Sequence, residues 1–167
     1  MESQTESKWK GKVDTTLSRA NPEQVWPLLQ DFFNLHKYFP TLSTSYGVQG
    51  TNGQAGCIRY CAGSSIPSNG SDGEIVSWCT EKLLEVDIVE MRLKYGILDG
   101  NIGFEGYVAT MKVLPRVSED GCVIEWSFEV NPIKGWSLGG MIEKYQKGLE
   151  GMARRIEECL QGDGEGK

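Results

Sequence analysis

The sequence contains only one histidine, His36, which limits the chemistry that it can support. A histidine-rich metal site would need more than this one histidine, and a histidine-assisted nucleophile would have to use His36 itself. Because His36 lies at a predicted helix end, a packing or capping role is favoured for it. No Walker loop is present. The glycines between Gly100 and Gly106 lie between two predicted strands, whereas a nucleotide-binding loop joins a strand to a helix.

Long apolar runs and clusters of basic residues are also absent. No run approaches the length that spans a membrane, and residues 1–7 are polar and acidic, without the apolar segment of a secretory signal. The net charge of −6 argues against a nucleic-acid partner. We therefore expect a cytoplasmic protein that neither spans a membrane nor binds nucleic acid. No segment identifies a protein partner.

The five cysteines are odd in number and match no metal-ligand spacing, so we predict no metal site. In a cytoplasmic protein they are expected to be reduced and buried. Cys57 and Cys61 share a predicted strand face, but nothing nearby marks either one as an activated thiolate. A structural role is therefore favoured for both.

Residues 137–160 are predicted to form one long C-terminal helix, which Ser137 caps. Apolar residues recur there at steps of three and four: Leu138, Met141, Ile142, Tyr145, Leu149, Met152, Ile156 and Leu160. This period is typical of a helix with one buried face. Gly148 and Gly151 lie inside it, either to pack closely on a sheet, which we favour, or to leave room for a ligand.

The rest of the chain reads as strands and short helices. Residues 9–17 alternate as a first strand, Asn21 and Gln24 form a capping box for a helix that Pro27 should kink or shorten, and residues 31–38 form a second short helix. The further strands are predicted at 43–49, 56–63, 73–83, 86–95, 102–114 and 122–130, with Asp99-Gly100 among the turns.

This order predicts an α+β fold, in which a curved seven-stranded antiparallel sheet wraps around the long C-terminal helix. Two short helices lie between strands 1 and 2. We expect a single domain over residues 8–160, with disordered tails at 1–7 and 161–167. Such a sheet can enclose more space than the helix fills.

Several polar residues fall on strand faces that otherwise look inward. Glu81 shares a face with Cys79, and Glu105 shares one with Tyr107. Arg59 lies between Cys57 and Cys61, but Ile58, Tyr60 and Ala62 make an equally apolar opposite face, so alternation leaves its direction open. In strand 86–95, Val89, Met91, Leu93 and Tyr95 share the predicted inner face.

Arg59 and Glu81 can be interpreted in two ways. If both point inward, they must pair with each other or with a ligand, because unpaired burial of a charge is costly. An arginine beside a carboxylate that moves a proton is a workable acid–base site. The alternative is an ordinary surface arginine and glutamate on neighbouring strands, which the pattern alone favours.

Seven short stretches carry a likeness to known proteins: Lys8–Val13, Pro22–Trp26, Asp31–Lys37, Gly56–Tyr60, Glu81–Leu83, Tyr107–Met111 and Trp126–Phe128. The order of elements resembles the helix-grip fold of the Bet v 1-like, START-like superfamily of polyketide cyclase/dehydrase and lipid-transport proteins. More closely, these stretches resemble those of the plant lachrymatory-factor synthases.

The resemblance implies an apolar pocket with an essential arginine and glutamate, at Arg59 and Glu81, which places Arg59 inward. The reaction would rearrange an unsaturated sulfenic acid to a thial S-oxide without a metal or organic cofactor. Glu81 would transfer the proton, and Arg59 would position the S–O group. The residues expected to bind the ligand are Tyr95, Phe104, Tyr107, Met111, Trp126, Tyr145 and Leu149.

The match has departures near the pocket. Phe104 stands where the family has a tyrosine, and Gly106 where it has an acid. The abscisic-acid receptors share the fold and close their pocket with a gate motif and a latch motif. In this sequence only Ser65–Ser68 lies near the position of the gate motif, and the latch motif has no counterpart, so hormone reception by that mechanism is not expected. We therefore carry two hypotheses about a small apolar or amphipathic molecule: a cofactor-free isomerase or lyase, or a ligand carrier or sensor without catalysis.

Overall fold

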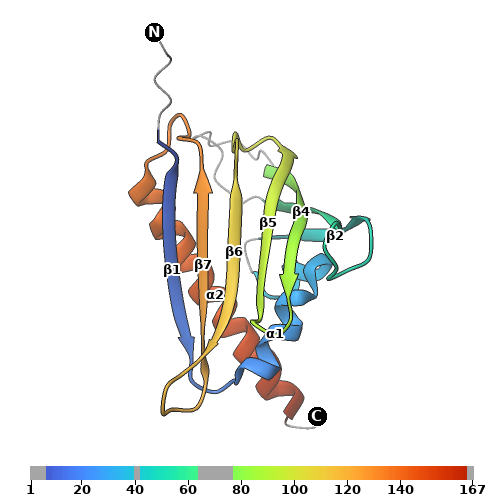
Figure 1. The fold of residues 1–167 in the computed structure, drawn as a ribbon, viewed down its shortest axis with the longest axis vertical. Coiled ribbons are helices and arrows are strands. Elements are labelled where there is room, and N and C mark those ends of the chain that lie inside the picture. The colour runs from blue at the N-terminus through green and yellow to red at the C-terminus, as the bar shows by residue number, and fades with distance from the viewer. Residues whose placement is uncertain (1–6, 40–41, 64–76, 165–167) are drawn as a thin grey trace.

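The structure is a computed structural model that describes residues 7–39, 42–63 and 77–164 (Figure 1). Its elements are β1 (Trp9–Leu17), α1 (Pro22–Gln30), the 3₁₀ helix η1 (Phe32–Lys37), β2 (Thr44–Gln49), β3 (Ile58–Gly63), β4 (Ser77–Asp87), β5 (Arg92–Gly100), β6 (Val108–Pro115), β7 (Cys122–Val130) and α2 (Leu138–Gly164). The strands form one antiparallel sheet in the order β1-β7-β6-β5-β4-β3-β2. The predicted helix-grip fold is confirmed.

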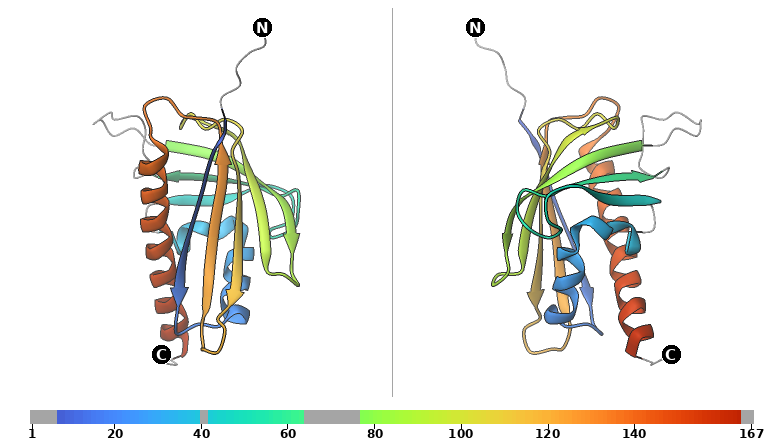
Figure 2. Two further views of the ribbon diagram at one scale, coloured as in Figure 1. Left: turned by 60° about the vertical axis from the view of Figure 1, so that its left-hand side comes forward. Right: turned by 90° about the vertical axis from the view of Figure 1, so that its right-hand side faces the viewer.

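The sheet curls toward α2. Figure 2 shows α2 along the concave side of the sheet, with α1 and η1 on the same side and β2 and β3 running steeply across the direction of β1 and β7. The strand pairing is irregular between Gly47 and Gln49, between Thr80 and Glu81, and between Leu83 and Glu85. Such bulges bend a strand and increase its twist, which lets this half of the sheet turn toward the helix.

The two strands beside α2 follow the sequence pattern most closely. β1 and β7 begin and end where they are predicted, and Cys122, Ile124, Trp126, Phe128 and Val130 of β7 are all buried. The alternation of β7 in the sequence therefore corresponds to one buried face in the structure.

The helix caps are also as predicted. The Asn21 side chain accepts a hydrogen bond from the Gln24 amide, and the Gln24 side chain accepts one from the Asn21 amide, each at 3.0 Å. Pro27 lies inside α1, which is only nine residues long. Ser137 Oγ accepts from the Gly140 amide at 3.0 Å, and α2 then runs four residues beyond the predicted end at Leu160.

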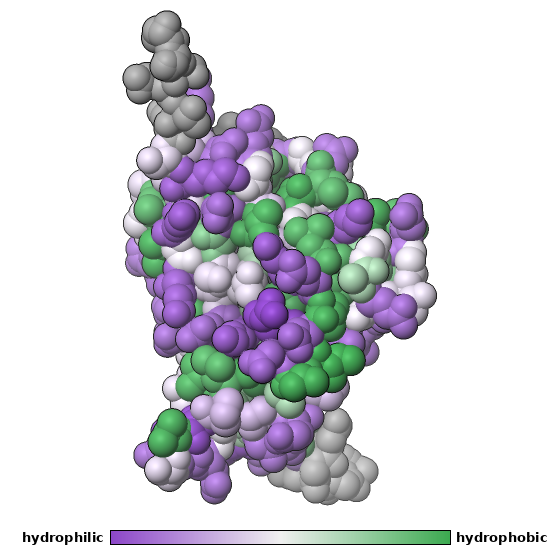
Figure 3. Space-filling view, in the orientation of Figure 1, coloured by the Kyte–Doolittle hydropathy of each residue, from purple (hydrophilic) through white to green (hydrophobic). Residues whose placement is uncertain are grey.

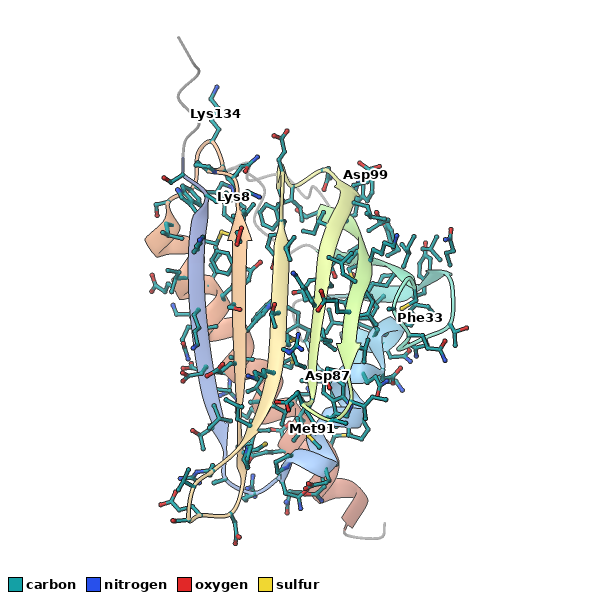
Figure 4. All side chains as sticks on the ribbon, in the orientation of Figure 1. Lys8, Phe33, Asp87, Met91, Asp99 and Lys134 are labelled. Carbon is teal, nitrogen blue, oxygen red and sulfur yellow. The ribbon has the colours of Figure 1, made fainter. Side chains whose placement is uncertain are left out.

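The predicted strand bounds at residues 83 and 86 are wrong, because the turn between β4 and β5 lies further along the chain. β4 continues to Asp87, whose carboxylate accepts a hydrogen bond from the Glu90 amide at 3.0 Å, and Met91 has φ +54°. Val89 is therefore 89% exposed in this turn, and Met91 precedes β5, so neither extends a strand face. Figure 4 shows Asp87 and Met91 at one end of the sheet and Asp99 toward the other. Asp99 and Gly100, predicted as a turn, end β5.

β6 begins at Val108 and not at residue 102. Gly103 and Gly106 have φ +96° and +67°, which interrupts an extended strand, and the Glu105 carbonyl accepts a hydrogen bond from the Asn131 amide at 3.0 Å. Glu105 is consequently exposed, and its predicted inward position is wrong.

The face of the sheet turned away from α2 mixes hydrophilic and hydrophobic residues (Figure 3). No helix in the described ranges is both long and apolar enough to cross a membrane. The predictions for residues 1–6, 165–167, Ser65–Ser68 and the first part of strand 73–83 lie outside the described residues.

Candidate functional site

The register of β3 and β4 brings the polar residues of the concave face together. Arg59 lies directly opposite Glu81, and Cys61 lies opposite Cys79. Arg59 is 4% exposed and Glu81 is 8% exposed. Arg59 therefore points inward, as the resemblance implied and alternation alone did not decide.

Arg59 holds Glu81 by one carboxylate oxygen. Oε1 of Glu81 accepts from Nε of Arg59 at 2.7 Å and lies 2.6 Å from its Nη2. Nη1 of Arg59 donates to the Phe32 carbonyl at 2.9 Å, and the guanidinium lies 3.6 Å from the centre of the Phe32 ring. Burial by itself would lower the pKa of Arg59, but Glu81, with Cys61 and Tyr95, raises it overall. Arg59 therefore stays charged.

Two thiols flank the carboxylate. Cys79 Sγ lies 3.6 Å from Oε2 of Glu81, and Cys61 Sγ lies 4.0 Å from Oε1 and 3.9 Å from Ser45 Oγ. Burial raises the pKa of Cys61 to about 12, and burial together with Glu81 raises the pKa of Cys79 as well. All five cysteines are free, and these two remain thiols rather than thiolates.

Three tyrosines continue the polar end of the site. Trp126 Nε1 donates to the Tyr95 hydroxyl at 3.0 Å, and the hydroxyls of Tyr107 and Tyr145 form a short hydrogen bond. Burial, followed by the charge of Glu81, raises the pKa of Tyr95; burial and the neighbouring tyrosines raise the pKa of Tyr107 and Tyr145. The phenols therefore stay protonated and can donate hydrogen bonds.

These groups line a cavity of about 430 Å³ between the sheet, η1 and α2. The described lining residues are Leu35, Phe39, Leu42, Arg59, Cys61, Cys79, Glu81, Tyr95, Ile97, Ile102, Phe104, Tyr107, Trp126, Trp136, Lys144, Tyr145, Lys147 and Gly148. Apart from the charged and tyrosine groups, this lining is largely apolar. Across the described residues, no three His, Cys, Asp or Glu side chains gather to hold a metal ion.

Most of the predicted site residues meet in this cavity. Arg59, Glu81, Tyr95, Phe104, Tyr107, Trp126 and Tyr145 line it. Met111 and Leu149 do not: Leu149 is fully buried in the core, and Met111 lies beside a separate pocket of about 30 Å³. His36 is not among the described lining residues, and its Nδ1 is buried with no hydrogen-bond partner among the residues described.

Sequence reasoning missed part of the wall and misjudged the helix glycines. Leu35 lies in η1 and Phe39 lies just after it, and in this irregular stretch no regular spacing of apolar residues marks an inner face. A Cβ on Gly148 would lie 3.2 Å from the Phe39 ring, whereas one on Gly151 would meet only Arg154, at 4.0 Å. Neither glycine packs closely on the sheet, and Gly148 leaves room in the cavity.

A comparison with protein families identifies the group to which this architecture belongs. Residues 10–157 match the family described as "Polyketide cyclase / dehydrase and lipid transport". The chain belongs to this family. Membership suggests binding of a hydrophobic ligand, and the apolar lining of the cavity agrees with that.

Two solved structures share the fold. An uncharacterized protein from Bacillus thuringiensis is 19% identical, with a TM-score of 0.67 over 88% of this chain and 98% of its own. The protein XoxI from Bacillus cereus is 18% identical, with a TM-score of 0.63 over 92% of this chain and 95% of its own. At these identities the likeness shows the fold alone.

The Arg59–Glu81 pair predicts an unequal response to single and double substitution. Arg59→Leu should destabilise the fold by about 3–5 kcal/mol, because it leaves the Glu81 carboxylate buried without its cation. Arg59→Leu with Glu81→Leu should recover a large part of that loss. Urea unfolding measures each variant, with Arg92→Leu as the control for a half-exposed arginine that pairs with Glu85 and Asp87, expected to cost less than Arg59→Leu. A double variant no more stable than Arg59→Leu would contradict this account.

The raised tyrosine pKa values predict a split titration. At about pH 11, above the usual tyrosine pKa of about 10, Tyr95, Tyr107 and Tyr145 should still be protonated, so at most half of the six tyrosines ionise in the folded protein. Because the folded state keeps these protons longer than the unfolded state, stability should fall as the pH rises through this range. Phenolate absorbance and circular dichroism measure both effects. Ionisation of all six with the fold intact would contradict the prediction.

Proposed function

We propose that the protein binds a small hydrophobic or amphipathic molecule in the cavity beneath α2. The observation that carries this proposal is the cavity itself, about 430 Å³ with a largely apolar lining and a buried ion pair at its polar end. Ligand pockets are typically of this size, with a few polar groups that orient the ligand. Family membership supports the same conclusion.

The helix glycines provide a matched test of binding. Gly148→Leu should abolish binding of the uncharged fluorescent probe N-phenylnaphthylamine, because its side chain would enter the cavity beside Phe39. Gly151→Leu, on the same helix and outside the lining, should bind the probe as the wild type does. Both changes remove a helix glycine, which favours the helix by about 1 kcal/mol, but a side chain at residue 148 also crowds the Phe39 ring. Urea unfolding and circular dichroism must therefore show both variants folded before their probe binding is compared. Absence of probe binding to the folded wild type would overturn the proposal.

The second candidate function is a cofactor-free isomerase or lyase of the lachrymatory-factor-synthase type. The observation that favours it is the asymmetric use of Glu81: Arg59 binds Oε1, while Oε2 contacts only the weak thiol donor of Cys79 among the described residues. Oε2 is therefore available to accept a proton inside the cavity. Three of the five N–H donors of Arg59 contact Glu81 and the Phe32 carbonyl, and within the described part of the chain the other two remain for an S–O group.

In this reaction Glu81 takes the O–H proton of an alkenyl sulfenic acid. A proton is then returned to the alkene carbon beyond the one bonded to sulfur, so a thial S-oxide forms and no atom is gained or lost. Arg59 and the hydroxyls of Tyr95 and Tyr107 hold the S–O oxygen as its charge grows. These roles require no metal or organic cofactor.

A coupled assay with freshly generated propenyl sulfenic acid tests the enzyme. Glu81→Gln should lose thial S-oxide production by at least about 100-fold, the usual contribution of a positioned acid–base group, while it still binds N-phenylnaphthylamine. Glu85→Gln, on the exposed face of the same strand, should retain activity. Arg59→Leu is assayed only where circular dichroism shows it folded. No product from folded wild type would exclude this activity and leave the ligand carrier.

A further inference from the structure

Charge is distributed unevenly along the wall of the cavity. Its described lining contains three cations, Arg59, Lys144 and Lys147, and one carboxylate, Glu81, which gives a net charge of 3 − 1 = +2. Glu81 neutralises Arg59 within the buried pair. The excess positive charge therefore belongs to the two lysines, although the chain as a whole carries −6.

The two lysines mark where the cavity opens. Both come from α2 and both are exposed, the Lys147 side chain at 74%. Because exposed residues line the cavity, its wall reaches the surface here. Lys144, Lys147 and Gly148 lie three and four residues apart, so they share one face of the helix, and Gly148 has no side chain to obstruct the opening. We call Lys144 and Lys147 the lysine rim.

The lysine rim is weakly compensated. Lys147 lies 3.5 Å from Glu143, but both side chains are exposed and such pairs contribute little. Within the described ranges, Lys144 has no ion pair. A rim of one sign beside a low-dielectric wall attracts ions of the opposite charge.

The space behind the rim is larger than a small reactive group needs. The cavity of about 430 Å³ falls within the range of roughly 300–1,000 Å³ that is typical of pockets for drug-sized ligands. The wall also includes the apolar side chains of Phe39, Ile97 and Trp136. The cavity therefore combines a buried ion pair, apolar walls and a cationic opening.

We propose that the ligand is an amphipathic anion, whose carboxylate, sulfonate or phosphate lies at the lysine rim and whose apolar body extends toward Arg59 and Glu81. This rests on the proposed function, since it names the class of molecule that the cavity binds. It requires no chemistry at Glu81.

Two fluorescent probes that differ by one charge test the proposal. Anilinonaphthalene sulfonate is N-phenylnaphthylamine with an added sulfonate group. The wild type should bind the sulfonate probe more tightly, by roughly three- to ten-fold, as expected for two exposed charge contacts. Lys144→Gln with Lys147→Gln should remove this preference, because it weakens binding of the sulfonate probe more than binding of N-phenylnaphthylamine. Lys144→Arg with Lys147→Arg should keep the preference, and added salt should reduce it.

The outcomes separate the two proposals. Equal affinity of the wild type for both probes, or a preference that the double glutamine variant retains, would overturn the role of the lysine rim while leaving the binding cavity in place. Lys134→Gln, outside the cavity lining, controls for the loss of charge alone. Failure of both probes to bind folded wild type would instead overturn the proposed function.

Discussion

The pairing of Glu81 with Arg59 is the interaction on which the concave face depends. A carboxylate buried to this degree needs a compensating charge, and the β3–β4 register supplies one directly opposite. Arg59 in turn requires the Phe32 carbonyl and lies over the Phe32 ring. One ion pair thus ties two strands to η1, and these elements form a wall of the cavity. The polar groups consequently hold together the part of the fold that encloses the cavity.

The parts of the fold that could be predicted are those in which one physical signal dominates. β1 and β7 alternate without interruption, and the Asn21 capping box sets the start of α1. The β4–β5 turn gave no such signal, because it contains no glycine: the Asp87 carboxylate holds the turn and Met91 takes the left-handed conformation at its end. Apolar Ile88 and Val89 in that turn look like strand residues in the sequence.

For the candidate site, the sequence identified most of the residues, but strand alternation did not decide whether every side chain points into the cavity. Alternation could not orient Arg59, and the structure shows why the opposite face of β3 is equally apolar: Tyr60 stacks on Tyr46 at 5.1 Å and on Trp78 at 6.0 Å on the outer surface. The resemblance supplied the direction that periodicity lacked. The walls from η1 were missed because their position depends on how an irregular segment crosses the sheet, which no local period encodes.

The two carboxylate oxygens of Glu81 have different partners, so the same ion pair can stabilise the fold and take part in the proposed function. A carboxylate with both oxygens bound by arginine would serve the fold alone. Here Oε1 takes the contacts from Arg59, and the donor that Oε2 meets among the described residues is the Cys79 thiol at 3.6 Å, which is a weak hydrogen-bond donor. A ligand donor can displace this contact at little cost while Arg59 keeps its hold on Oε1. The pair can therefore stabilise the wall of the cavity and still present a hydrogen-bond acceptor, Oε2 of Glu81, to its interior.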